Sequence, residues 1–207
     1  MNQMQHDFLS GPVAQDYSGV LGAPFRVFLS GGVTTKVDEA TGKTMTSIVD
    51  LAGLFAEILR SRVLHPRKLS GEDLKFIRST LQMRSHEVAS VLELTPEHYS
   101  RCEGGTKTLS ASSEKHYRMF VFLEASCRNK HVQDKLAKDL EEKTAVDPKE
   151  AKKAVAAFRR VFVEMKIQHI YPIGEELEFC FSRRECPQCE CVEDDGTWQD
   201  EADRAAA

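Results

Sequence analysis

Residues 83–105 read MRSHEVASVLELTPEHYSRCEGG, and this stretch decides the fold. If Ser85 begins a helix, Val88 and Leu92 share one apolar face, as helical periodicity requires. Ala89 is small, so a second helix can cross close to the first. The pattern predicts two helices joined by a tight turn, at the spacing that lets one helix brace the next.

The second helix is marked at both ends. Thr95 can cap its N-terminus, and Pro96 suits the first helical position because its missing N–H costs nothing there. Tyr99 and Cys102 then face the core, and two glycines after residue 103 end the helix. A helix is therefore expected over 96–103, with its outer face free.

Helical signals continue on both sides of this pair. Ser70 and Asp73 form a variant capping box before a helix expected over about 71–82. A serine-rich segment precedes an apolar helix that contains Tyr117, Phe120, Val121 and Leu123. Further helices are expected near 130–143 and 148–168. The stripe on the last helix is more typical of a core face and alternatively suits a dimer surface; it comprises Ala151, Val155, Phe158, Phe162 and Met165.

Strand signals lie toward both ends of the chain. Two β-rich runs surround Ser-Gly-Gly after Phe25 and TMTSIV follows a turn, which predicts a hairpin or a three-stranded meander. Asp50 can then cap a helix that ends before Pro66. Near the C-terminus, ELEFCFS resembles a strand, and TWQ resembles its partner.

We therefore expect a mainly α fold with a small β element. The expected division is a flexible N-terminal arm (1–24), a small β-α unit (25–66), a helix-turn-helix DNA-binding domain (67–128) and a C-terminal helical, dimerising region with an acidic tail (129–207). The C-terminal region is expected to combine helices with a short β-hairpin.

The segment LKFIRSTLQMRSHEVASVLELTPEHYSRCEGG resembles the lambda-repressor-like, Xre-type helix-turn-helix domain, over roughly residues 69–125. The matching positions are Ile77–Arg78, Val88–Ala89, Leu92, Leu94–Thr95, Ser100–Arg101, Glu103 and Gly105. Four positions depart from the family pattern. Glu93 stands where the family has Gly, Arg84 replaces a Ser/Thr cap, Ser85 replaces Gln, and Tyr99 is larger than the usual Ile or Val.

The resemblance implies a homodimeric regulator of transcription that places helix 96–103 in the major groove of double-stranded DNA. His98 and Arg101 are the expected base-edge contacts, and Glu97 can accept from cytosine. The expected phosphate contacts beside this helix are Arg84, Ser85, Thr106, Lys107 and also Arg78. Each could instead be a solvated surface side chain, and Arg101 could pair with Glu97 one helical turn earlier.

Two functional interpretations stay open. The first is an autoregulatory repressor; many proteins of this type are antitoxins or phage and mobile-element regulators, so a toxin could be a further partner. The second is a protein-interaction adaptor or anti-activator on the same fold without DNA contacts. The net charge is −4, but residues 67–131 hold 11 Lys and Arg against 8 Asp and Glu, whereas residues 170–207 hold 3 against 11. Local potential governs phosphate attraction, so the acidic total does not exclude DNA binding.

Cysteines and apolar runs limit the remaining possibilities. Cys180, Cys186, Cys189 and Cys191 could form a four-sulfur zinc site, although a reduced thiol loop is the favoured interpretation and no other cofactor is expected. The sequence has no phosphate-cradling Gly loop, nucleophile elbow or paired His on one helical face, so an enzyme is not predicted. The longest apolar runs fall far short of the roughly 20 residues that span a bilayer, and no signal pattern opens the chain. A cytoplasmic protein with no membrane partner is therefore expected.

Overall fold

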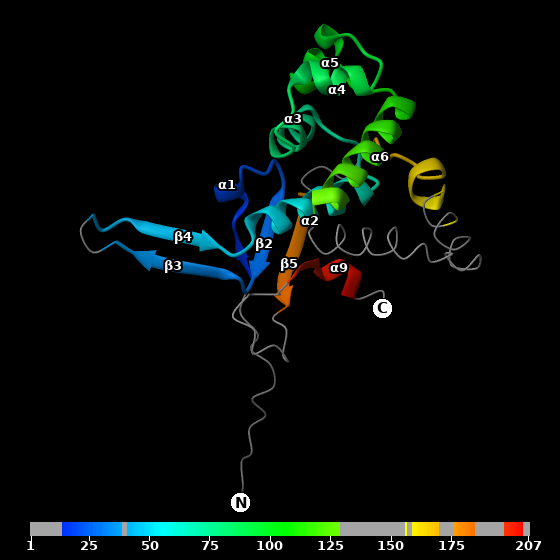
Figure 1. Cartoon of the computed structure of the whole chain (residues 1–207). Coiled ribbons are helices and arrows are strands. Elements are labelled where there is room, and N and C mark those ends of the chain that lie inside the picture. The colour runs from blue at the N-terminus through cyan, green and yellow to red at the C-terminus, as the bar shows by residue number, and fades with distance from the viewer. Residues whose placement is uncertain are drawn as a thin grey trace, which may run out of the picture.

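The computed structural model describes residues 14–38, 41–128, 156, 159–169, 176–184 and 197–204 of the chain (Figure 1). Its strands are β1 (Gln15–Asp16), β2 (Arg26–Ser30), β3 (Val33–Val37), β4 (Thr44–Ile48), β5 (Glu178–Arg184) and β6 (Thr197–Asp200). Its helices are α1 (Ser18–Leu21), α2 (Leu51–Leu64), α3 (Gly71–Thr80), α4 (Ser85–Val91), α5 (Pro96–Glu103), α6 (Ala111–Arg128), the π-helix η1 (Arg159–Val163) and α9 (Glu201–Arg204). The expectation of a mainly helical chain with a small β element is confirmed.

The main sheet joins segments that lie far apart in the sequence. Its strand order is β1-β2-β5-β6, and β2 runs parallel to β5, with Arg26 opposite Glu178 and Ser30 opposite Ser182. The predicted antiparallel pairing of the two C-terminal strands is confirmed in β5 and β6. The three-stranded meander was wrong, because β2 pairs with β1 and β5, and only β3 and β4 form the hairpin.

Part of the N-terminal arm that we expected over 1–24 is folded in the structure, and residues 1–13 lie outside the described residues. Residues 14–24 include β1 and α1, and the Tyr17 N–H donates to the Val27 carbonyl at 2.8 Å. Leu21 is buried in the core. This segment is held because it adds a strand to the edge of β2 and contributes an apolar side chain.

One continuous hydrophobic core runs from Leu21 to Trp198. Strands β2 and β5 turn alternate side chains toward it, among them Val27 and Phe181, because side chains alternate between the faces of a strand. Helix α2 packs against α6 and carries this core onward to the helices α3–α5. The expected boundary between residues 66 and 67 therefore does not coincide with a break in the core.

The C-terminal half is described only in part. The expected helix near 130–143 lies outside the described residues, as do residues 148–155 and 157–158 of the one near 148–168. The expectation that the second helix continues to 168 was wrong: η1 ends at Val163, and Gln168 forms a β-bridge with Arg67 instead. Within η1, Phe162 is buried, and its ring meets that of Phe122 on α6 at 5.3 Å. This member of the predicted stripe packs within its own chain. In the parts that the structure describes, no helix combines the length and apolar character needed to cross a membrane.

Candidate nucleic-acid interface

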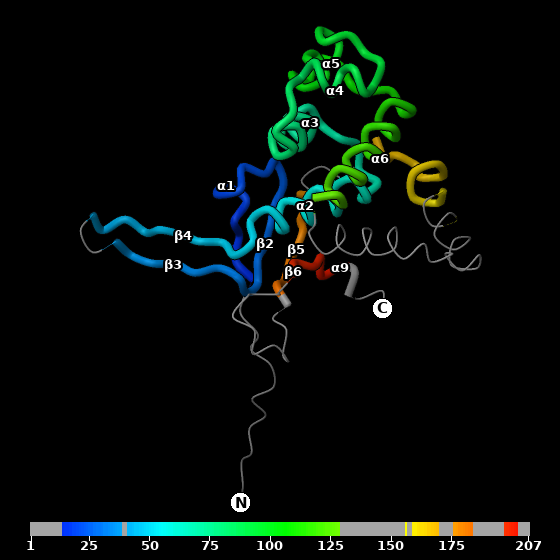
Figure 2. The backbone as a smooth tube through the Cα atoms, in the orientation of Figure 1, coloured from blue at the N-terminus to red at the C-terminus, as the bar shows by residue number. Residues whose placement is uncertain are grey.

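Helices α4 and α5 follow one another through a short turn at the end of the molecule farthest from the main sheet (Figure 2). Helix α5 begins where the sequence predicted, because the Thr95 hydroxyl accepts from the His98 N–H at 3.2 Å and Pro96 occupies the first turn. Helix α4 is capped by only one half of a capping box. The Glu87 carboxylate accepts from the Arg84 N–H at 2.6 Å, and an arginine side chain has no acceptor to return the bond.

Three successive helices end in the same hydrogen-bonded motif. After α4, the Leu94 N–H donates to the Ala89 carbonyl and the Glu93 N–H to the Ser90 carbonyl, which is the Schellman pattern. The same pair of bonds closes α3 and α5. Its left-handed position is held by Gln82 after α3 (φ 54°), Glu93 after α4 (φ 54°) and Gly105 after α5 (φ 73°). The turn that the family builds with Gly is therefore built here with a strained glutamate.

Relieving that strain is expected to stabilise the protein. Replacing Glu93 with Gly should raise the free energy of unfolding by about 0.5–1 kcal/mol, because left-handed strain of about 1–2 kcal/mol is partly offset by the freedom that glycine gains on unfolding. Glu93→Gln removes the same charge and keeps the strain, so it should show no such gain. Urea denaturation of the three proteins measures this, and equal stability of Glu93→Gly and Glu93→Gln would contradict the assignment of strain.

The inner face of α5 is seated in the core. Tyr99 is fully buried, and its ring packs edge-on against Tyr117 of α6 at a centroid distance of 6.4 Å. The core therefore accommodates this large side chain. Burial raises the pKa of both hydroxyls. Cys102 is also buried, and burial raises the pKa of its thiol. These contacts fix the rotation of α5 about its own axis.

A glycine sets the distance between α3 and the end of α5. A Cβ atom on Gly71 would lie 2.5 Å from the Glu103 carbonyl oxygen and 2.7 Å from the Cys102 carbonyl oxygen. Both atoms belong to the backbone and cannot swing aside. The N-terminus of α3 thus rests directly on the last turn of α5, at a separation that only a glycine permits.

The outer face of α5 is open to solvent. Glu97, Ser100 and Arg101 are exposed, and His98 is half-buried. Within the described part of the chain, no ion pair involves Arg101, so the alternative in which it pairs with Glu97 is not found. This face carries the expected base-reading residues, and α5 lies at the top of the described structure in Figure 1.

The expected phosphate contacts differ in their surroundings. Arg84, Thr106 and Lys107 are exposed, and the Thr106 hydroxyl donates to the Arg101 carbonyl at 3.0 Å. The Ser85 hydroxyl is buried and has no hydrogen-bond partner among the residues that the structure describes. Arg78 ties α3 to α5, because its Nε donates to the Glu103 carboxylate at 2.6 Å and its Nη1 donates to the Met83 carbonyl; its phosphate contact stays a prediction.

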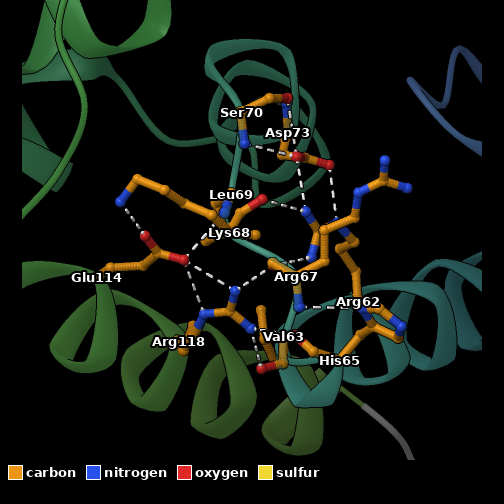
Figure 3. Close-up of polar contacts among 10 residues, drawn as sticks. All are labelled: Arg62, Val63, His65, Arg67, Lys68, Leu69, Ser70, Asp73, Glu114 and Arg118. Atoms are coloured by element: carbon orange, nitrogen blue, oxygen red, sulfur yellow. Dashed lines mark hydrogen bonds and ion pairs between the residues drawn. The ribbon is translucent and has the colours of Figure 1, made fainter. Parts of the chain in front are cut away.

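Beneath these helices lies a buried ionic clamp, which we define as Arg62, Lys68, Asp73, Glu114 and Arg118 (Figure 3). The Glu114 carboxylate accepts from Arg118 at 2.8 Å, from the Lys68 ammonium at 2.7 Å and from the Leu69 N–H at 2.9 Å. Arg118 and Glu114 are fully buried. Burial lowers the pKa of the Arg118 guanidinium, and the Glu114 carboxylate opposes that effect.

The two arginines of the clamp hold the backbone between α2 and α3. Arg118 donates to the carbonyls of Val63, His65 and Arg67, at 2.8, 2.5 and 2.6 Å. Arg62 donates to the carbonyls of Arg67 and Lys68 and makes a two-point pair with Asp73, at 2.9 and 2.8 Å. Asp73 also completes the predicted capping box with Ser70, which is confirmed. These contacts to the backbone between α2 and α3 join α2, α3 and α6 into one unit.

Sequence reasoning missed this clamp. Glu114 and Arg118 are four residues apart on the buried face of α6, beside Tyr117 and Val121, and Arg62 lies beside buried positions of α2. A charged residue on an apolar helical face is the available signal. It does not reveal the partner, because Arg62 meets Asp73 and Lys68 meets Glu114 only after the helices have packed.

The predicted zinc site can be followed at one position only. Cys180 lies in β5, and its thiol pKa is raised, first by burial and then by Glu201, Glu178 and Asp200. Cys186, Cys189 and Cys191 lie outside the described residues. Zinc binding stays a prediction.

Comparison with protein-family models, curated proteins and solved structures found no match to this chain.

Proposed function

We propose that this protein is a sequence-specific double-stranded DNA-binding transcriptional regulator with a lambda-repressor-like helix-turn-helix core, acting as a homodimeric repressor. Helix α5 would enter the major groove, His98 and Arg101 would contact base edges, and Arg84, Thr106 and Lys107 would contact phosphates. The mechanism would be occlusion of a promoter element, for an autoregulated or neighbouring set of genes.

One observation carries the proposal. The outer face of α5 is open to solvent, while its inner face is fixed by Tyr99 and Cys102 and its last turn rests on Gly71. A helix that is held from behind and carries an exposed arginine in front is suited to reading base edges, because the helix loses little freedom on binding.

Removal of the Arg101 side chain tests the proposal. Arg101→Ala should weaken binding to a selected site by about 1–3 kcal/mol, or about 5- to 150-fold, because a guanidinium pairs with guanine at two points. The site is first obtained by selecting genomic fragments that the purified protein retains, and affinity is then measured by fluorescence anisotropy. Thermal unfolding should be unchanged, because Arg101 is exposed.

Two matched variants distinguish the reading of bases from the electrostatic attraction of any DNA sequence. Lys107→Ala should weaken binding to all sequences and reduce the salt dependence by about one phosphate contact. Arg160→Ala, which removes an exposed cation from η1, should change nothing. If Arg101→Ala behaves like Arg160→Ala, or if no genomic fragment is retained, the proposal fails.

The second candidate is an adaptor that binds a protein instead of DNA. The alternation of Glu97 and Arg101 on α5 favours it, because a mixed-charge face suits a protein better than a polyanion. The acidic segment 170–207 would suit a basic protein partner, such as a toxin. Under this alternative, the parent protein would retain no genomic fragment, and Glu97→Gln would weaken capture of the protein partner.

A further inference from the structure

The hairpin formed by β3 and β4 extends away from the rest of the molecule (Figure 1). Among the described residues, its contacts with the core lie at its base: Val33 and Ile48 pack against the core, and the Trp198 indole N–H donates to the Val49 carbonyl at 3.0 Å. Toward its tip, the side chains of Val37 and Met45 are 63% and 65% exposed. A two-stranded ribbon is marginal by itself in water, so an additional strand would stabilise it.

The hydrogen bonds reveal which backbone groups face outward. Asp38 N–H donates to the Lys43 carbonyl and Val49 N–H to the Gly32 carbonyl, so these residues form the hydrogen-bonded pairs at both ends of the hairpin. Pairing alternates along an antiparallel ladder. Therefore Thr44, Thr46 and Ile48 turn their N–H and C=O groups away from β3, along the open edge of β4.

The open edge of β4 can form hydrogen bonds with the same edge of a second copy of the chain. If two β4 strands run antiparallel about a two-fold axis at Thr46, Thr46 faces Thr46 and Thr44 faces Ile48. Each of these pairs would exchange two hydrogen bonds. The strand TMTSI contains no charge and no proline, which are the features that normally protect an open edge.

The other edge of the hairpin is less suitable. Strand β3 carries Lys36 next to its central residue Thr35, and self-pairing about Thr35 would make the two copies of Lys36 diagonal neighbours. On β4, by contrast, pairing extends one β-branched face. That face comprises Val33, Thr35, Val37, Thr44, Thr46 and Ile48, which are opposite or alternate residues in the register.

We propose that β4 is a homodimer interface, at which two copies of this chain join their hairpins into a four-stranded antiparallel sheet. The inference deepens the homodimer of the proposed function and rests on that part of it, but it does not depend on DNA binding. A five-residue edge buries less than the roughly 1,200 Å² of a stable complex, so the dimer should be reversible and concentration-dependent.

A pair of proline variants tests this interface in the full-length protein. Thr46→Pro removes an outward N–H and should convert the dimer to monomer in sedimentation velocity, while the hairpin keeps its internal bonds. Thr35→Pro makes the same change on the outward edge of β3 and should leave the dimer intact. Circular dichroism reports whether both variants fold.

Cross-linking provides a second measurement. Thr46→Cys should form a disulfide-linked dimer under mild oxidation, because hydrogen-bonded antiparallel pairs hold their Cα atoms about 5.5 Å apart, within the range of a disulfide. Thr35→Cys is the matched control and should cross-link no more than the unmodified chain.

The outcomes are distinct. A monomeric parent protein at all concentrations, or a dimer that survives Thr46→Pro, overturns the interface. If Thr46→Pro leaves the oligomeric state unchanged and abolishes DNA retention, the hairpin contacts DNA and the interface is also overturned. Failure of DNA retention in the parent protein, with dimerisation as expected, refutes the DNA-binding proposal alone.

Discussion

Glu114→Ala is expected to lower the free energy of unfolding by about 3–5 kcal/mol, the cost of breaking a buried ion pair on one side. Glu114 is fully buried, and its two carboxylate oxygens accept hydrogen bonds from Arg118, Lys68 and the Leu69 N–H. Without it, the Arg118 charge stays in the core without a carboxylate. Removing one partner costs more than the pair contributes, because the desolvation of the other is no longer offset.

Glu124→Ala is the matched control, because it makes the same substitution on the same helix at a half-exposed position. It should change stability by no more than about 0.5 kcal/mol. Chemical denaturation of both variants supplies the comparison. Similar losses in the two would mean that the clamp contributes little, and that α2, α3 and α6 are held by apolar packing alone.

Gly71→Ala is expected to destabilise the protein by about 3 kcal/mol, at the upper end of the usual range for overpacking. The added methyl would meet the carbonyl oxygens of Cys102 and Glu103 at 2.7 and 2.5 Å, and the Gly105 nitrogen at 2.9 Å. Because all three are backbone atoms, relief requires α3 and α5 to separate. Under the proposed function, the same displacement should reduce DNA affinity in whatever fraction stays folded.

Gly104→Ala is the matched control, because Gly104 follows the last turn of α5 that Gly71 contacts. Its φ is −76°, and a Cβ there would meet its nearest atom, the Ser100 carbonyl oxygen, at 3.4 Å. The substitution should be neutral or stabilising by up to about 1 kcal/mol, since alanine restricts the unfolded chain. Thermal unfolding of the two alanine variants measures the difference. Equal midpoints would refute the close approach of Gly71 to the last turn of α5.

The local features were predictable because each is decided within a few residues. Thr95 and Ser70 act as caps through hydrogen bonds to atoms three residues away, and Pro96 restricts its own backbone. The bounds of α5 followed from these signals. The resemblance to the helix-turn-helix family also rested on such short-range positions, and it indicated which face of α5 should be buried.

The strand partners could not be predicted in the same way. Strand β2 pairs with β5, about 150 residues later, although β3 is its neighbour in the chain. Alternation of apolar residues marks a strand but does not name its partner. The predicted meander pairs strands that are neighbours in the sequence. Pairing of β2 with β5 instead brings Val27, Leu29, Phe179 and Phe181 together in the core.

By itself, the sequence determined where the helices α2 to α6 begin and where their turns lie, because capping groups, prolines and glycines act on the backbone beside them. Tertiary structure alone decided that Arg62 pairs with Asp73, that Arg78 pairs with Glu103, and that Gly71 supports the last turn of α5. The physical reason is that a buried charge or a close backbone contact depends on the atoms that desolvate or meet it. Those atoms come from other helices, and they are brought near only when the whole core has formed.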